Sequence, residues 1–151
     1  MRIREAVAED ADAISELTRD LTRKYIAPEL PPAGRKFLND ALSPKHVRRN
    51  MEEGCRYHVC EIGGSIVGVA AMRPHGHLLK LFVAESAQGR GIARALWTAA
   101  RDACIHSGHE GGFTVSAARG AEAMYARLGF VRSGEETTEH GVTRVPMRYA
   151  G

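Results

Sequence analysis

The chain has 151 residues, of which 44% are hydrophobic and 26% charged, and its formal net charge is +3. These values are typical of one soluble globular domain, here residues 1–151, and exclude a disordered or fibrous chain. The small positive charge gives no reason to expect nucleic acid as a partner. No apolar run approaches the roughly 18 residues of a membrane span. Three cysteines without a zinc-site spacing suit a cytoplasmic protein with reduced thiols.

The first third of the chain predicts a strand, a helix, a loop and a second helix. Residues 2–7 alternate between polar and apolar, which favours a strand, and residues 9–25 repeat apolar side chains at helical spacing. Residues 26–37 hold three prolines and a glycine, which indicates a loop. Residues 43–53 begin with Ser-Pro, a typical N-cap and first helical residue.

The middle of the chain predicts a hairpin, a buried strand and a helix. Residues 56–62 and 65–73 are strand-like and flank the pair Gly-Gly, which favours a tight turn. Residues 77–84, HLLKLFVA, are nearly all apolar, so this strand is expected at the centre of a sheet, covered on both faces. Apolar residues at helical spacing predict a helix over 91–107.

The last third predicts three strands and one helix. Residues 111–117 form a strand, 121–128 a helix that Gly129 would end, and 130–136 and 142–150 the final strands. The resulting order of elements, β-α-α-β-β-β-α-β-α-β-β, predicts an α/β fold with a mixed sheet.

The stretch QGRGIAR, residues 88–94, joins a predicted strand to a predicted helix. Glycines let the backbone turn tightly and approach a ligand, and the first N–H groups of a helix attract anions. Arg90 and Arg94 add positive charge. The spacing matches neither a Walker A loop nor a dinucleotide fingerprint. The stretch is therefore a phosphate site or an ordinary strand–helix turn with solvated arginines.

Two motifs together resemble the GCN5-related N-acetyltransferase (GNAT) family. Residues 88–93, QGRGIA, resemble the family's Gln/Arg-x-x-Gly-x-Gly/Ala signature, and MYARLGF, residues 124–130, resembles its Y-x-x-x-G-F segment. The opening residues and the order of elements are also similar. The resemblance implies a mostly antiparallel sheet of about six or seven strands, splayed between its two central strands and flanked by about four helices.

The same resemblance implies acetyl-CoA as cosubstrate, without a metal. The glycine turn, residues 88–94, would bind the pyrophosphate, and the strand before it would pair with the pantetheine arm. Ser116 stands where relatives carry asparagine. The cofactor-binding residues implied in this way are Leu81, Phe82, Val83, Gln88, Gly89, Arg90, Gly91, Ile92, Ala93, Arg94, Ser116 and Tyr125.

Two residues are candidates for catalysis. Tyr125 matches the family tyrosine that protonates the departing thiolate, although it could also be a packed helix tyrosine. His77 stands where several relatives carry a glutamate base, and its ordinary pKa near 6.5 suits that task. Strand alternation puts His77, Leu79, Leu81 and Val83 on one face if no bulge intervenes. The alternative is an exposed histidine in a turn.

The acceptor and the assembly remain open at this point. We expect transfer to a primary amine of a small molecule or a protein by direct attack; the alternatives are a non-catalytic acyl-CoA sensor and a site for another phosphorylated ligand. A homodimer is possible for a domain of this size. Acidic residues in two expected substrate loops could attract a cationic amine or simply be solvated; they are Glu29, Glu135, Glu136 and Glu139.

Overall fold

The computed structural model describes residues 1–151 and contains five α-helices and eight strands. In chain order these are β1 (Arg2–Glu5), α1 (Ala11–Tyr25), α2 (Pro32–Ala41), α3 (Pro44–Glu52), β2 (Arg56–Ile62), β3 (Ser65–Met72), β4 (His77–Val83), α4 (Ile92–His106), β5 (Thr114–Ala118), α5 (Glu122–Leu128), β6 (Phe130–Arg132), β7 (Thr137–Glu139) and β8 (Val142–Tyr149).

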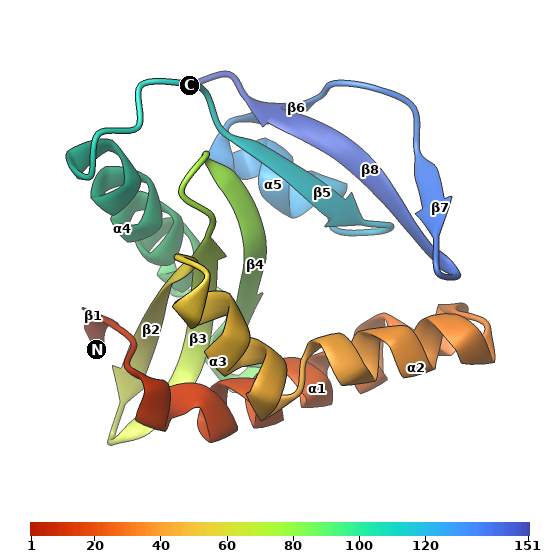
Figure 1. The fold of residues 1–151 in the computed structure, drawn as a ribbon, viewed down its shortest axis with the longest axis horizontal. Helices are drawn as coiled ribbons and strands as arrows, with labels where there is room; N and C mark the ends of the chain where they lie inside the picture. The colour runs from red at the N-terminus through yellow and green to blue at the C-terminus, as the bar shows by residue number, and fades with distance from the viewer.

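All eight strands belong to one mixed sheet (Figure 1). The strand order is β1-β2-β3-β4-β5-β8-β6, and β7 pairs with β8 beside this path. Only β4 and β5 are parallel, and every other pair is antiparallel. The predicted α/β fold with a mostly antiparallel mixed sheet is confirmed.

The sheet opens between its two central strands. β4 and β5 pair at only two positions, His77 with Thr114 and Leu78 with Val115. Beyond these residues the two strands diverge, as Figure 1 shows, and each continues toward its carboxyl end without the other. The predicted splay is confirmed, and it leaves one edge of β4 without a strand partner.

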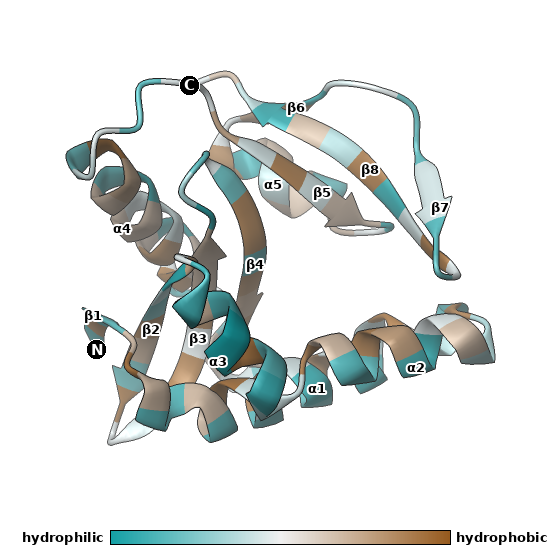
Figure 2. Ribbon diagram, viewed as in Figure 1, coloured by the Kyte–Doolittle hydropathy of each residue, from teal (hydrophilic) through white to brown (hydrophobic).

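Each face of the sheet carries its own core. On one face α4 and α5 cover a large cluster in which Trp97 packs edge-on against Phe113 and Phe130, with ring centroids 5.4 and 4.9 Å apart. On the other face α1 and α3 cover a smaller cluster that includes Ile14 and Val47. In Figure 2 much of β3 and β4 is brown, as suits strands covered on both faces, whereas α3 is mostly teal because Val47 is its one buried residue. No helix is both long and apolar enough to cross a membrane.

The predicted loop over 26–37 is wrong in its second half, because α2 begins at Pro32. Proline disfavours helix interiors, yet it suits the first helical position, where no intrahelical N–H bond is needed. The predicted strand over 130–136 ends early, at Arg132, and the short strand β7, which begins at Thr137, was not predicted. The fold has five helices where about four were expected, and eight strands where six or seven were expected.

A bulge interrupts β4. Leu78 pairs with Met72 and Lys80 with Ala71, so Leu79 has no partner on β3. Leu79 consequently packs against the core under α1, whereas Leu81 belongs to the core under α4. The expectation that Leu79 and Leu81 share a face is therefore wrong, because one extra residue reverses the alternation.

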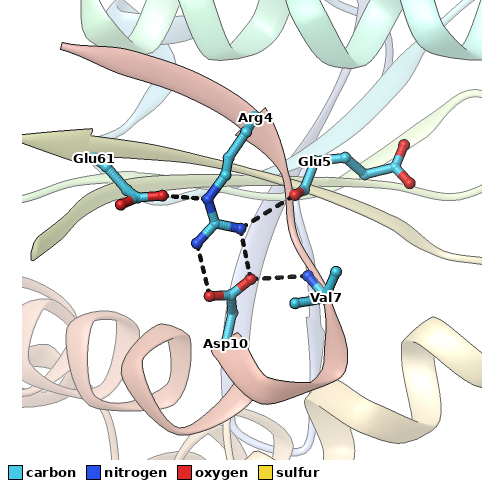
Figure 3. A network of polar contacts seen from close by, with 5 residues as sticks. All are labelled: Arg4, Glu5, Val7, Asp10 and Glu61. Atoms are coloured by element: carbon cyan, nitrogen blue, oxygen red, sulfur yellow. Dashed lines mark hydrogen bonds and ion pairs between the residues drawn. The ribbon is translucent and has the colours of Figure 1, made fainter. Parts of the chain in front are cut away.

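Arg4 ties the first strand to its surroundings (Figure 3). Its two terminal nitrogens donate to the two carboxylate oxygens of Asp10 at 2.8 Å each, and its Nε donates to Glu61 on β2. Asp10 also accepts the Val7 N–H at 2.8 Å. The Arg4 guanidinium, with this N–H, holds the pKa of the Asp10 carboxyl below its usual range. These contacts fix β1 and the start of α1 against the sheet.

Candidate functional site

A cavity of about 1040 Å³ occupies the opening between β4 and β5. Its walls come from both faces of the sheet, with α4 and α5 on one side and α1, α2 and α3 on the other. Ten of the predicted site residues line it: Leu81, Phe82, Val83, Gln88, Gly89, Gly91, Ile92, Ala93, Ser116 and Tyr125. His77, Arg90 and Arg94 are predicted site residues that are absent from the lining.

The glycine turn forms one end of this cavity. Gly89 and Gly91 have φ angles of 80° and 75°, in the left-handed region that favours glycine. Gly91 is the N-cap of α4, and no heavy atom lies within 4 Å of a Cβ built at either glycine. The open space lies in front of the unpaired N–H groups of the first helical turn. The turn can therefore receive a phosphate group.

Two side chains of residues 88–94 hold this stretch against its neighbours. The Gln88 amide donates to the Val83 carbonyl at 3.1 Å and so holds the turn against the end of β4. Arg94 donates to the Arg127 carbonyl at 2.6 Å in the last turn of α5. Arg94 therefore joins α4 to α5, two helices that line the cavity.

The exposed edge of β4 runs along the middle of the cavity. Because β5 diverges after Leu78, alternate N–H and C=O groups of the following residues have no strand partner on that side. Leu81 and Val83 line the cavity on β4, and Ser116 faces it from β5. This edge can pair with an extended chain that carries amide groups, as the pantetheine arm does.

Tyr125 lies on α5 at the cavity wall. Its side chain is buried, and its ring meets that of Phe130 edge-on with centroids 5.8 Å apart. Burial raises the pKa of Tyr125 to about 12, and the positive charge of Arg144 opposes this shift. At neutral pH the phenol is therefore protonated and can donate, and Arg144 would stabilise the phenolate left behind.

His77 lies at the closed end of the opening. Its Nδ1 lies 2.8 Å from the Thr114 hydroxyl oxygen, across the short parallel pairing of β4 and β5. Burial lowers its pKa, and the nearby charges of His75, Arg73 and Arg144 lower it further. The structure does not bring His77 and Tyr125 together in the cavity lining. The role of His77 as a base stays a prediction.

A buried lysine that no sequence motif marks lies at the cavity floor. Lys80 is 7% exposed, and its ammonium donates to the Tyr57 hydroxyl oxygen at 3.0 Å. The Asn50 amide donates to the same oxygen at 3.1 Å. Burial lowers the pKa of Lys80 to about 8. A single charge inside the apolar run LLKLFV was the signal that could have revealed this residue.

Cations also outnumber carboxylates around Lys80. Arg73, at the end of β3, and Arg144, on β8, line the cavity with it. Of the acidic residues considered as an attraction for a cationic amine, only Glu29 lines the cavity. Glu136 instead forms an exposed ion pair with Arg119 at 2.9 Å. No group of three or more histidine, cysteine, aspartate or glutamate side chains is arranged to hold a metal ion.

A contact between α2 and the β7–β8 turn lies beside the cavity. The ring of Phe37 stacks on that of His140 at 4.3 Å between centroids. A Cβ at Gly34 would lie 2.7 Å from the Gly141 carbonyl oxygen, so glycine is what permits this close approach. Figure 1 shows α2 passing below the end of this hairpin. Phe37 and Val142 line the cavity from the two sides of the contact.

Comparison with known proteins gives one family. The model of the acetyltransferase (GNAT) domain matches residues 17–150. No curated protein matches the chain in sequence. Among solved structures, a GCN5-related N-acetyltransferase from Rhodopseudomonas palustris has a TM-score of 0.80 at 18% identity, covering 98% of this chain and 94% of that one.

Two further structures were solved with the cosubstrate or its product. The PaiA N-acetyltransferase from Thermoplasma acidophilum, in complex with coenzyme A, has a TM-score of 0.77 at 15% identity and covers 98% of both chains. The yncA protein from Salmonella typhimurium, with its cofactor acetyl-CoA, has a TM-score of 0.73 at 18% identity and covers 98% of this chain and 92% of that one. These likenesses show the fold, and the family model matches most of the chain. The chain belongs to the GNAT acetyltransferase family.

Proposed function

We propose that this protein is an acetyl-CoA-dependent N-acetyltransferase that moves the acetyl group to a primary amine by direct attack within a ternary complex. One observation carries the proposal: a single cavity joins the glycine turn, the open edge of β4 and the buried Tyr125, and continues to the opposite face of the sheet. The donor and the acceptor can therefore enter from opposite faces and meet at the opening. We also propose the cytoplasm as its location, in keeping with three free cysteines.

Acetyl-CoA supplies an acyl group already activated as a thioester. The protein's own residues would bind and orient it: the N–H groups of Gly91 and the first turn of α4 would hold its phosphates, and the edge of β4 at Leu81 to Val83 would align its arm. An unpaired N–H of that edge can also donate to a carbonyl oxygen on which negative charge develops.

Tyr125 would act as the proton donor to the leaving sulfur. Its hydroxyl is buried, so water competes poorly for its proton, and its pKa of about 12 keeps it protonated until the sulfur departs. The charge of Arg144 favours the phenolate that forms, and the proton lost by the attacking nitrogen returns to this phenolate, which leaves the amide and the free thiol. No cysteine needs to react, which agrees with the buried positions of Cys55, Cys60 and Cys104.

Initial-rate kinetics test this proposal. Both substrates are varied, and the acetylated amine is identified by mass spectrometry. Direct attack predicts intersecting double-reciprocal lines, because both substrates must be bound before a product leaves. Parallel lines would indicate an acyl-enzyme and contradict the ternary complex. Tight acetyl-CoA binding without any transfer would instead favour the non-catalytic sensor.

A further inference from the structure

The acceptor end of the cavity carries an unbalanced positive charge. Lys80, Arg73 and Arg144 line it, and none of them forms an ion pair with a carboxylate of the chain. The charge of Glu139 reaches Arg144 without forming an ion pair. Glu29 is the one carboxylate in the lining. Most buried charges in proteins have a partner of opposite sign, so this arrangement is unusual.

Lys80 shows the imbalance most clearly. Its ammonium has a hydrogen bond from Nζ to the neutral Tyr57 hydroxyl, which provides no counter-charge. Tyr57 is 1% exposed and accepts a second hydrogen bond from Asn50, so it is a fixed part of the floor. A charge removed from water in this way is costly to the fold unless another group compensates it.

The three cations share one neighbourhood. After burial, the charge of Arg73 is among the influences that lower the pKa of Lys80. The charges of Arg73 and Arg144 both act on His77, which begins β4. Lys80 on β4, Arg73 just after β3 and Arg144 near the start of β8 therefore line one cavity and act on neighbouring groups.

These cations are poorly placed for the phosphates of CoA. The glycine turn follows the carboxyl end of β4, and Lys80 precedes Val83 by three residues, about 10 Å of extended strand. The bulge at Leu79 also turns Lys80 toward Tyr57, which belongs to the core under α1 and α3. Lys80 therefore faces away from α4, whereas Arg144 acts both here and on Tyr125.

We propose that the acceptor is a small primary amine that carries an anionic group, of which an amino acid is the simplest example, and that Lys80, Arg73 and Arg144 bind this group. This inference rests on the proposed acetyltransferase function and names its substrate class. The bound anion would provide the counter-charge that the chain itself omits. The same cations would disfavour an ammonium beside them, so they would help to keep the attacking amine neutral.

The test compares matched acceptors. Each amino acid of a broad panel is paired with its own carboxamide, and phosphoethanolamine with ethanolamine, so that carboxylate and phosphate are examined separately. The expected result is a kcat/KM at least tenfold higher for one anionic member than for its neutral partner. In Lys80→Met this ratio should fall toward one, mainly through a rise in KM. Lys45→Met, on the exposed face of α3, should keep the ratio.

A binding measurement keeps the result independent of turnover. Calorimetry of the CoA-saturated protein with the same panel, in buffers of different ionisation enthalpy near pH 8, should show proton uptake with the anionic members. An anion beside Lys80 raises its pKa, and Lys80→Met removes the group that takes up the proton. Arg144→Met provides a second variant in which the affinity for the anion should fall while Lys80 remains.

The outcomes separate the two proposals. Equal rates and affinities for anionic and neutral partners, or a preference for polyamines, would overturn the anionic acceptor and leave the acetyltransferase intact. Lys80-dependent binding of an anion without transfer to any amine would support the anion site and contradict the acetyltransferase. If no amine is acetylated and no anionic member of the panel binds, both proposals are wrong.

Discussion

The Lys80 ammonium and the Tyr57 hydroxyl form a hydrogen bond of 3.0 Å at the floor of the cavity, where no carboxylate neutralises the charge. Burial lowers the pKa of Lys80 to about 8 from an ordinary value near 10.5. The buried ammonium therefore lowers the free energy of unfolding, and a bound anion would offset this loss. Buried charges that destabilise the fold are common at functional sites, and the loss of stability can be measured.

Replacing this lysine should stabilise the fold. Between pH 8 and 10.5 the unfolded chain binds a proton at Lys80 that the folded chain has released, so the free energy of unfolding should rise with pH across this window. Below pH 8 the penalty is fully present and amounts to about 3 kcal/mol. Lys80→Met should therefore raise stability at pH 7 by about 1–3 kcal/mol, measured by urea unfolding. Lower stability of this variant would show that the lysine supports the fold.

Removing the Tyr125 hydroxyl should slow turnover and leave binding in place. Tyr125→Phe keeps the ring that packs against Phe130 and removes the proton donor. We expect kcat to fall roughly 100-fold, within the range of general acid catalysis, with the acetyl-CoA Kd changed less than a few-fold. Stopped assays give kcat, and calorimetry gives Kd. An unaltered kcat would remove Tyr125 from the mechanism.

A side chain at Gly91 should weaken acetyl-CoA binding. Gly91→Val forces a β-branched residue to a φ of 75° and fills the space before the first turn of α4. The matched control is Gly63→Val, in the β2–β3 turn, where φ is 58° and nothing crowds a Cβ either. Both variants should lose stability, but only Gly91→Val should raise the acetyl-CoA Kd. Equal affinities in the two would place the phosphates elsewhere.

A methyl group at Gly34 should alter acceptor use. In Gly34→Ala the new Cβ would meet the Gly141 carbonyl oxygen, so α2 must move away from the β7–β8 turn and disturb the Phe37–His140 stack. We expect a several-fold rise in the KM for the acceptor with little change in the KM for acetyl-CoA. Lys36→Ala, on the exposed face of α2, is the control. If acceptor KM stays constant, this contact has no part in the acceptor site.

The Arg4–Asp10 pair should make stability depend on acid. The pKa of Asp10 is lowered in the folded chain, so the stabilisation is present above pH 4 and is lost as the pH falls through the lowered pKa. Asp10→Asn should cost about 1–3 kcal/mol at pH 7, as expected for hydrogen bonds to charged groups, and should flatten the fall in stability below pH 4. Thermal unfolding at several pH values measures both effects.

Features with a local cause could be predicted from the sequence. The turn at residues 88–94 could be recognised because positive φ angles before a helix favour glycine, and the sequence has Gly89 and Gly91 there. The splay followed from the resemblance to the family, since nothing in the residues of β4 alone requires β5 to diverge. The helix α2 was missed because the prolines that begin it also occur in loops.

Features that depend on a partner strand could not be predicted. The bulge at Leu79 exists only in the register of β4 with β3, and it decides that Lys80 faces Tyr57. His140 adopts a φ of 53°, which side chains other than glycine rarely do, because β7 and β8 are joined by a two-residue turn against Phe37. Lys80, Arg73 and Arg144 come from different parts of the sheet and meet only in the folded chain. In the sequence only Lys80 stands out, as a single charge in an apolar run.

Thiol release from acetyl-CoA across a broad panel of amines tests the central claim most directly. The panel should contain amino acids with their carboxamides, polyamines, arylamines and peptides, and Tyr125→Phe should be measured beside the wild type. The account predicts release above background with at least one class of primary amine, and loss of that release in the variant. Saturable acetyl-CoA binding with no release for any amine would contradict it.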